Sequence, residues 1–442
     1  MNRIQPMRGA QALMTGWLLA AALALSAFRA DAGAMSSCDD PVVFQGARVQ
    51  VFVLPFIAEG PLSARGRELV TILQRHVLHA ALKYHSLGVV ELTGDDALCS
   101  YERTTAEVRR RLKQGQVAIF VSGRMFEQRE AMLLQTRVEF SAPGAPEVLR
   151  WRLGATASDV TTATVPPEPV DFAPRSIPIG YLQQLQEAQA GARRIYSAPD
   201  PAASFWELPA DPDARFGFVV LDAKEGWMRV EVSNRAGEGW VRTDTLAGAA
   251  DLKGTFPELH FIDGLIGYHL LTSPGASAPA TQDPGAEAQS RRTLSATIES
   301  FDRYLVATQG RAESEVRALA KVLQGNAILR AAPQPWPTPQ LKAAQRHYLA
   351  ARELAPTSTA ASTFALACGS ALCTRGACSL DADRLHEDFI EAIGRDPSSR
   401  ELIGDLQAFY AAAQLGKLQV RMPADELGRQ RALTQSVMAG MD

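Results

Sequence analysis

Residues 192–246 constrain the fold of this chain more than any other stretch. Three short segments there are rich in aromatic and branched residues, namely FGFVVL (216–221), WMRVEV (227–232) and GWVR (239–242). Glycine, asparagine and charged residues fill the intervals between them, which is the composition of turns. Strands this short and this evenly spaced predict a small closed β-barrel.

Three motifs in this stretch resemble the bacterial SH3-like domain, SH3b. They are YSAP (196–199), GWMRV (226–230) and AGEGWV (236–241), with Ala236 in place of the first glycine of the last motif. The resemblance implies a binding module and not a catalyst. Many members of that family hold stem peptides in an aromatic groove, so it implies a peptidoglycan stem peptide or another peptide as ligand.

Four aromatic residues are the candidate ligand-binding groups of this module: Tyr196, Trp206, Trp227 and Trp240. Tyr196 precedes a turn and Trp206 lies in a predicted inserted loop, so we expect both at the rim, where flat rings cover a peptide at low entropic cost. Trp227 and Trp240 each follow a glycine at a strand start. One of them can line the groove, or both can be core; we expect Trp240 to be essential for stability.

The amino terminus has the pattern of a secretory signal peptide. Arg3 and Arg8 precede an apolar run at 13–28, and the sequence Ala-Asp-Ala at 30–32 fits a cleavage site. The alternative, a membrane anchor, is disfavoured because the apolar run is short for a bilayer. Residues 1–32 are therefore expected to be removed. The mature chain is expected to be periplasmic or secreted, with no transmembrane segment.

The net charge and the cysteines limit which partners and which crosslinks can be expected. The net charge of −3 gives no reason to expect nucleic acid as a partner. Export permits disulfides, and a disulfide between Cys38 and Cys99 is expected to crosslink the first domain. The remaining three cysteines can form one bridge and leave one thiol, with Cys373 and Cys378 as the candidate pair. A metal site is the alternative, but no CxxC motif accompanies them, so we expect neither metal nor cofactor.

Residues 39–154 have the pattern of an α/β sandwich. Buried-type strands alternate with helical spacing in the order β-α-β-α-β-β. The segments VFVLPF (51–56), FVSG (120–123) and LLQTRVEF (133–140) resemble the amino-terminal domain of TolB and its periplasmic relatives. That resemblance implies an envelope scaffold. Residues 155–191, rich in proline at first, are expected to be an extended linker that ends in a helix.

Residues 255–442 are predicted to be helical, with a flexible loop at 273–287 that is rich in alanine, proline and glycine. The segment YLAARELAPTS (348–358) is echoed by FIEAIGRDPSS (389–399), 41 residues later. The aromatic residue, the small residue three positions on and the terminating proline resemble the tetratricopeptide (TPR) repeat. A true TPR and a generic helical array both remain open, and either implies a concave protein-binding face.

No catalytic constellation is found in the sequence. No phosphate loop follows Phe56, no Gly-x-Ser-x-Gly elbow is present, and His76 with His79 lacks an acidic ligand in register. We therefore expect three parts, an α/β domain, an SH3-like barrel and a TPR-like array, in a non-enzymatic envelope scaffold or adaptor that binds a peptide, peptidoglycan or an envelope protein. The alternatives are a regulator of a cell-wall synthase and a cell-wall hydrolase with an unrecognised active site.

Overall fold

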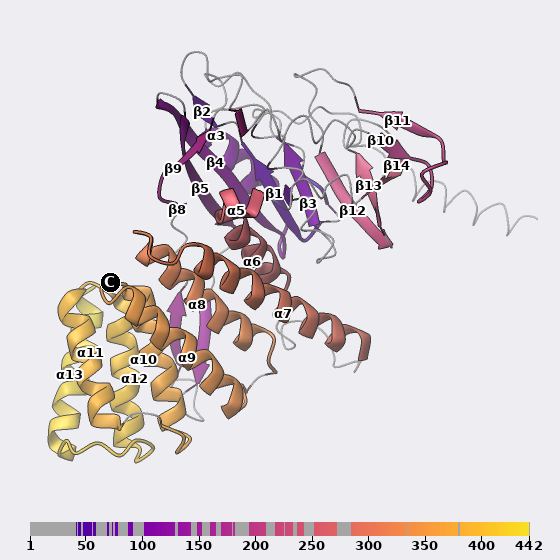
Figure 1. Ribbon diagram of the computed structural model, residues 1–442. Helices are drawn as coiled ribbons and strands as arrows, with labels where there is room; N and C mark the ends of the chain where they lie inside the picture. Colours follow the sequence, from indigo (N-terminus) through magenta and orange to yellow (C-terminus); the bar gives the residue numbers. More distant parts are fainter. Residues whose placement is uncertain are drawn as a thin grey trace, which may run out of the picture.

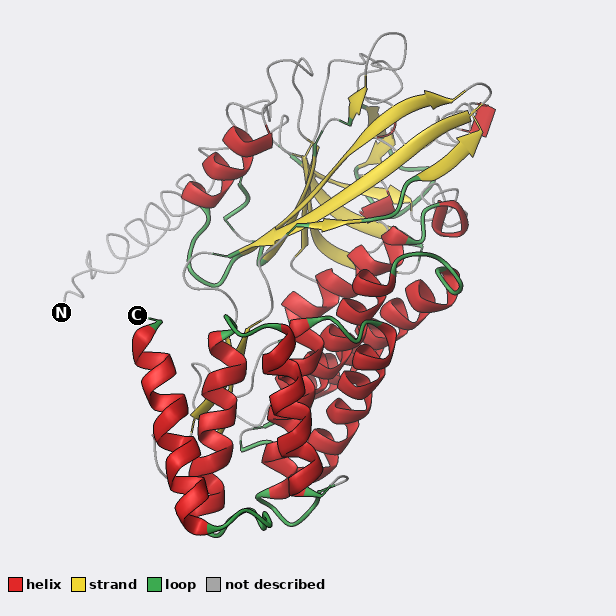
Figure 2. Cartoon of the chain, turned by 90° about the vertical axis from the view of Figure 1, so that its left-hand side faces the viewer, coloured by secondary structure: helices red, strands yellow, loops and turns green. Residues whose placement is uncertain are grey.

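The structure is a computed structural model with mixed α/β content, in which a large sheet lies on one side of an array of helices (Figures 1 and 2). It describes residues 41–58, positions 69, 73, 76 and 77, and then 87–91, 101–128, 131–142, 148–152, 160–164, 169–181, 194–208, 217–232, 237–242, 252–271 and 284–441. Within these ranges it leaves out positions 42, 46, 55, 179, 225, 334, 379 and 380. Residues 1–40, which include the predicted signal peptide, lie outside this part.

The centre of the large sheet is parallel. Strand β1 (Val49–Val53) lies between β3 (Leu87–Glu91) and β4 (Val117–Gln128) and runs parallel to both. The remaining strands on this side, all pairing with β4 or β5, are β5 (Ala131–Ser141), β2 (Ile57–Ala58), β8 (Val170–Asp171) and β9 (Arg175–Pro178). All five residues of β1 are buried, as expected of a parallel strand covered on both faces.

Two layers cover this centre. Helix α3 (Tyr101–Arg111) packs Val108 against Phe52 and Phe120 on one face of the sheet. On the other face, the core includes Val51, Leu73 and the residues of helix α6 (Glu258–Leu270). The sheet is therefore sandwiched between helices in its central part.

The strands of the predicted barrel continue this same sheet. They are β10 (Arg194–Tyr196), β11 (Phe205–Glu207), β12 (Gly217–Lys224), β13 (Trp227–Val232) and β14 (Glu238–Arg242). Strand β12 pairs antiparallel with β3, with Phe218 opposite Val89, so the full order is β11-β10-β14-β13-β12-β3-β1-β4-β5-β8 in a 12-stranded sheet. The expected closed barrel is not found among the described residues. Pairing with β12 protects what would otherwise be an exposed edge at β3.

The helical region follows the sheet in chain order. Its helices are α5 (Leu252–Thr255), α6, α7 (Pro284–Ala307), α8 (Ser314–Arg330), α9 (Thr338–Leu354), α10 (Thr359–Cys373), α11 (Ala382–Arg395), α12 (Arg400–Gln414) and α13 (Ala424–Gly440). From α6 onward each helix packs against the next one, forming the layered array of Figure 1. Side chains of Ser358, Asp381 and Ser399 cap α10, α11 and α12 by accepting a backbone N–H three residues on.

Two expectations about connectors need correction. The predicted linker at 155–191 contains strand β7 (Val160–Thr164) as well as β8 and β9. Strand β7 forms a hairpin with β6 (Val148–Arg152), and this hairpin lies against α10 and α12, away from the large sheet (Figure 1). The predicted flexible loop at 273–287 ends early, because α7 begins at Pro284, a residue favoured in a first helical turn.

A buried charged network joins the sheet to the helices. Arg175 on β9 donates to Glu258 at 2.8 Å and to Glu313 at 3.0 Å. Thr136 on β5 and Tyr304 on α7 each donate a further hydrogen bond, to Glu258 and Glu313 respectively. Strands β5 and β9 and helices α6, α7 and α8 are thereby held to one another. No helix among the described residues is long and apolar enough to span a bilayer.

Candidate ligand-binding face

One face of strands β10, β11, β13 and β14 carries a row of aromatic side chains, which we call the aromatic face. Phe205 lies opposite Tyr196, Tyr196 opposite Trp240, and Trp240 opposite Arg229. Residues directly opposite one another in a sheet point to the same face. Three rings and a guanidinium therefore follow one another across four neighbouring strands.

The rings of the aromatic face contact one another. The ring centroids of Tyr196 and Phe205 are 5.5 Å apart, and Trp227 meets Tyr196 edge-to-face at 5.0 Å. Tyr196 and Trp227 are only 7% and 8% exposed, whereas Phe205 is 47% exposed and Trp240 is half-buried. The buried pair supports a ring surface that solvent reaches at Phe205 and Trp240.

Ion pairs flank these rings. Arg194 lies over the ring of Phe205 at 4.5 Å and pairs with Glu207 at 3.1 Å. The hydrogen bond to Glu207 raises the pKa of Arg194, so this cation stays charged at every physiological pH. Arg229 pairs with Glu238 beside Trp240. The aromatic face thus combines apolar rings with charged groups that can orient a polar ligand.

The structure places Trp206 and Tyr196 differently from the expectation, and it places Trp240 in one of the two expected positions. Trp206 forms part of β11 and lies opposite Ile195, on the face that packs into the hydrophobic core. Trp240, a candidate groove residue that was also expected to be essential for stability, lies half-buried on the aromatic face, and Val241 takes the core position next to it. Tyr196 was expected at the rim, but it is buried beneath its neighbours.

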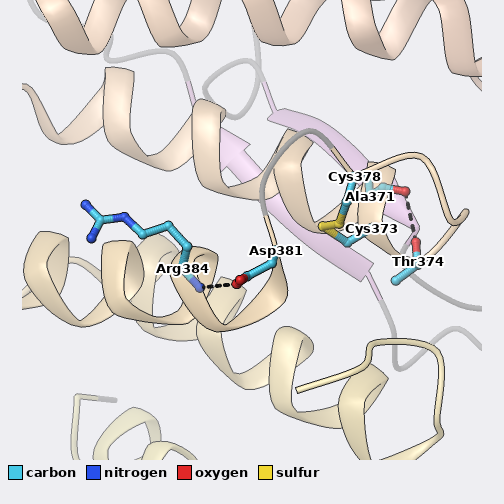
Figure 3. Close-up of a disulfide and its surroundings, with 6 residues drawn as sticks. All are labelled: Ala371, Cys373, Thr374, Cys378, Asp381 and Arg384. Carbon is cyan, nitrogen blue, oxygen red and sulfur yellow. Dashed lines mark hydrogen bonds between the residues drawn. A yellow bond between two sulfur atoms is a disulfide. The ribbon is translucent and has the colours of Figure 1, made fainter. Parts of the chain in front are cut away.

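Of the candidate cysteines, Cys373 and Cys378 are joined by a disulfide just after α10 (Figure 3). Thr374, in the turn that this bond closes, donates its hydroxyl to the carbonyl of Ala371 at 2.9 Å. Cys368 is a free, buried thiol, and burial raises its pKa, so it has little thiolate character. Cys38 and Cys99 lie outside the described residues.

The histidines and carboxylates that the sequence places near one another have structural partners. His386 shares a hydrogen bond of 2.8 Å with Tyr410, and Asp388 pairs with Arg352 at 3.1 Å. His76 is buried, with its Nε2 4.0 Å from Asp263. Within the described ranges, no group of three or more His, Cys, Asp or Glu residues could hold a metal ion.

A cavity on the α3 side of the large sheet was not predicted from the sequence. It encloses about 670 Å³ between the end of β1, the far half of β4 and the first turn of α3. No sequence motif indicates this cavity, because its described lining residues come from five separate segments. The available signal was the order of the strands, which places a crevice beside β1.

Comparisons with known proteins add nothing to these assignments: no protein family, no curated protein and no solved structure matches the chain.

Proposed function

We propose that this chain is a non-enzymatic scaffold or adaptor of the cell envelope, and that it holds a peptide ligand against the aromatic face. The observation that carries the proposal is the row formed by Phe205, Tyr196 and Trp240 and continued by Arg229. A peptidoglycan stem peptide is the ligand that the SH3b resemblance favours. An envelope protein that presents a peptide segment is the alternative partner.

The chemistry of the aromatic face suits a peptide. Tyrosine, tryptophan and arginine are the residues that dominate binding energies at interfaces, because large rigid rings lose little entropy on binding. Here the buried Tyr196 and Trp227 hold the ring surface in place before any ligand arrives. A surface organised in advance avoids part of the ordering cost of association.

The helical array supports the adaptor part of the proposal by offering a second surface. Helix α13 exposes Leu433 and Val437, which are four residues apart and so share one face of that helix. Exposed apolar side chains that are neighbours on a helix are suited to contact with another protein. One chain could then link a wall peptide to a protein partner.

Binding to purified sacculi and to a soluble stem peptide tests the proposal. Phe205→Ala and Trp240→Ala should each weaken binding by about 1–3 kcal/mol, the cost of removing a hot-spot aromatic side chain. Ile390→Ala is the matched control, because Ile390 is 49% exposed on α11 and Phe205 is 47% exposed. Trp206→Ala should instead lower stability, since that ring packs against the core. If the wild-type chain binds neither ligand, peptidoglycan is excluded and a protein partner remains.

Export is part of the proposal and rests on the sequence alone. Amino-terminal sequencing of the protein from an envelope extract should give Gly33, or a residue within one or two positions of it, as the first residue. A protein that begins at Met1 and stays in the cytosolic fraction would contradict a periplasmic location.

A further inference from the structure

The cavity on the α3 side of the large sheet lies where the strand order reverses. The chain passes from β1 to β3 on one side, and later to β4 on the other side of β1. In open α/β sheets, ligands bind outside the carboxyl ends of the strands at such a reversal. Val53, the last residue of β1, pairs with Val121, so the cavity residues Ser122, Gly123 and Arg124 lie just beyond the end of β1.

Polar and charged side chains supply much of the described lining of this cavity. Tyr101 and Glu102 contribute from the first turn of α3, Gln135 and Arg137 from β5, and Asp171 from β8. Its volume of about 670 Å³ falls within the range of small-molecule sites, roughly 300–1,000 Å³. The site can therefore hold a small organic molecule.

The large apolar side chains among the described lining residues are Leu54 and Ile57, which follow the end of β1. Ile57 is more than half exposed although it is a large apolar side chain, so a ligand seated beside it would remove apolar surface from water.

Two cations and two carboxylates are among the described residues that line the cavity, so their formal charges cancel, and what matters is which of them are paired. Arg137 pairs with Asp171 at 3.9 Å and lies over the ring of Tyr101 at 5.6 Å. Glu102 lies in the first turn of α3, where the helix dipole favours a carboxylate. Arg124 is exposed and forms no ion pair with any other residue in the described part of the chain. Arg124 is therefore a guanidinium without an ion-pair partner among the described residues, and it lines the same cavity as the first turn of α3.

We propose that this cavity binds a small molecule carrying a single carboxylate. The carboxylate lies against Arg124, and the apolar body of the molecule lies against Leu54 and Ile57. Arginine matches the planar geometry of a carboxylate with two parallel N–H donors. Asp171 and Glu102 disfavour a ligand of higher negative charge at the same position.

Calorimetric titration of the full chain with benzoate, benzamide and inorganic phosphate tests this proposal. Benzoate and benzamide have nearly the same shape, so the difference between them measures the charge preference. Benzoate should bind at millimolar concentration or below. Benzamide should bind about tenfold to a hundredfold more weakly, the factor that a charge-assisted hydrogen bond supplies. Phosphate should bind more weakly than benzoate.

Two variants separate the site from non-specific binding. Arg124→Gln should remove the preference for benzoate over benzamide, and Ile57→Glu should weaken benzoate binding by adding a like charge. Both residues are exposed, so the thermal unfolding curve should stay unchanged. Arg292→Gln, at an exposed position on α7, is the control and should bind as wild type. Absence of benzoate binding, equal binding of the two probes, tighter binding of phosphate, or an unaltered preference in Arg124→Gln would each overturn the proposal.

Discussion

Replacing Arg175 by methionine should destabilise the junction between the sheet and the helical array. Arg175 is the only cation that hydrogen-bonds both Glu258 and Glu313 among the described residues, and all three side chains are almost fully buried. Methionine fills a similar volume but leaves two carboxylates without their partner. The cost is therefore that of uncompensated buried charge and not of a cavity.

The size of the effect follows from the burial of these groups. Removing one partner of a buried ion pair costs about 3–5 kcal/mol, whereas an exposed pair contributes about 0–1 kcal/mol. The control is Arg303→Met on α7, because Arg303 pairs with Glu299 where both side chains are 54% exposed. Urea unfolding at pH 7, followed by circular dichroism, should separate the two variants by several kcal/mol.

The effect should also depend on pH, through Glu258. Burial raises the pKa of Glu258 above its ordinary value, and the charge of Arg175 opposes that rise. A carboxyl whose pKa is raised by folding contributes stability that is complete at low pH and is lost as the pH rises through the folded-state pKa. Without Arg175 the pKa of Glu258 rises further, so the deficit of Arg175→Met should be smaller near pH 5 than near pH 7.

Two results would refute this reasoning about the network. One is an Arg175→Met variant no less stable than Arg303→Met. The other is a deficit that is the same at both pH values, because an uncompensated carboxylate must respond to protonation. Arg175→Lys should fall between wild type and Arg175→Met, since an ammonium keeps the charge but lacks the planar fork that reaches both carboxylates.

Two further predictions concern the helical array. Cys373→Ala should lower the free energy of unfolding by about 2 kcal/mol under oxidising conditions, the chain-entropy value for so short a loop. Reductant should remove this difference from wild type. Equal unfolding curves for the two proteins in both conditions would show that the bond to Cys378 does not form. Gly325→Ala should destabilise the α8–α9 contact by about 1–3 kcal/mol, because its Cβ would lie 2.4 Å from the ring of Tyr348. Gly404→Ala, which meets nothing within 4 Å, should stabilise α12 by about 0.5–1 kcal/mol; thermal unfolding that gave both alanine variants the same sign would contradict this packing.

Much of the secondary structure could be predicted from local pattern. The apolar run that contains Val49–Val53 is a buried strand, and residues 255–442, predicted to be helical, contain the helices α6 to α13. The pairing of β12 with β3 could not be predicted, because pairing between strands that are distant in the sequence leaves no local pattern. The hairpin of β6 and β7 was missed for a related reason: β7 falls in the predicted linker, and the hairpin packs against α10 and α12, which are more than 190 residues further along the chain.

Three of the four candidate residues, Tyr196, Trp227 and Trp240, lie on the aromatic face, whereas Trp206 lies on the opposite face and Phe205 takes its place. The alternation in WMRVEV correctly separates Met228 and Val230, which are core, from Trp227 and Arg229. Shifting a strand by one residue exchanges its two faces, so the side on which Trp240 lies depends on where β14 begins. Trp206 was assigned to a loop, and a residue in a loop has no predictable face. The register of β10, β11 and β14 supplies what the local pattern lacks.

Amide hydrogen exchange of the full chain, with and without a soluble stem peptide, tests the central claim most directly. Bound peptide should slow exchange in β10, β11, β13 and β14, the strands that carry the aromatic face, and should leave α7 to α13 unchanged. The same addition to Phe205→Ala should give less protection at equal peptide concentration. Protection confined to the helical array, or no protection anywhere at a saturating concentration, would contradict the assignment of the ligand-binding face.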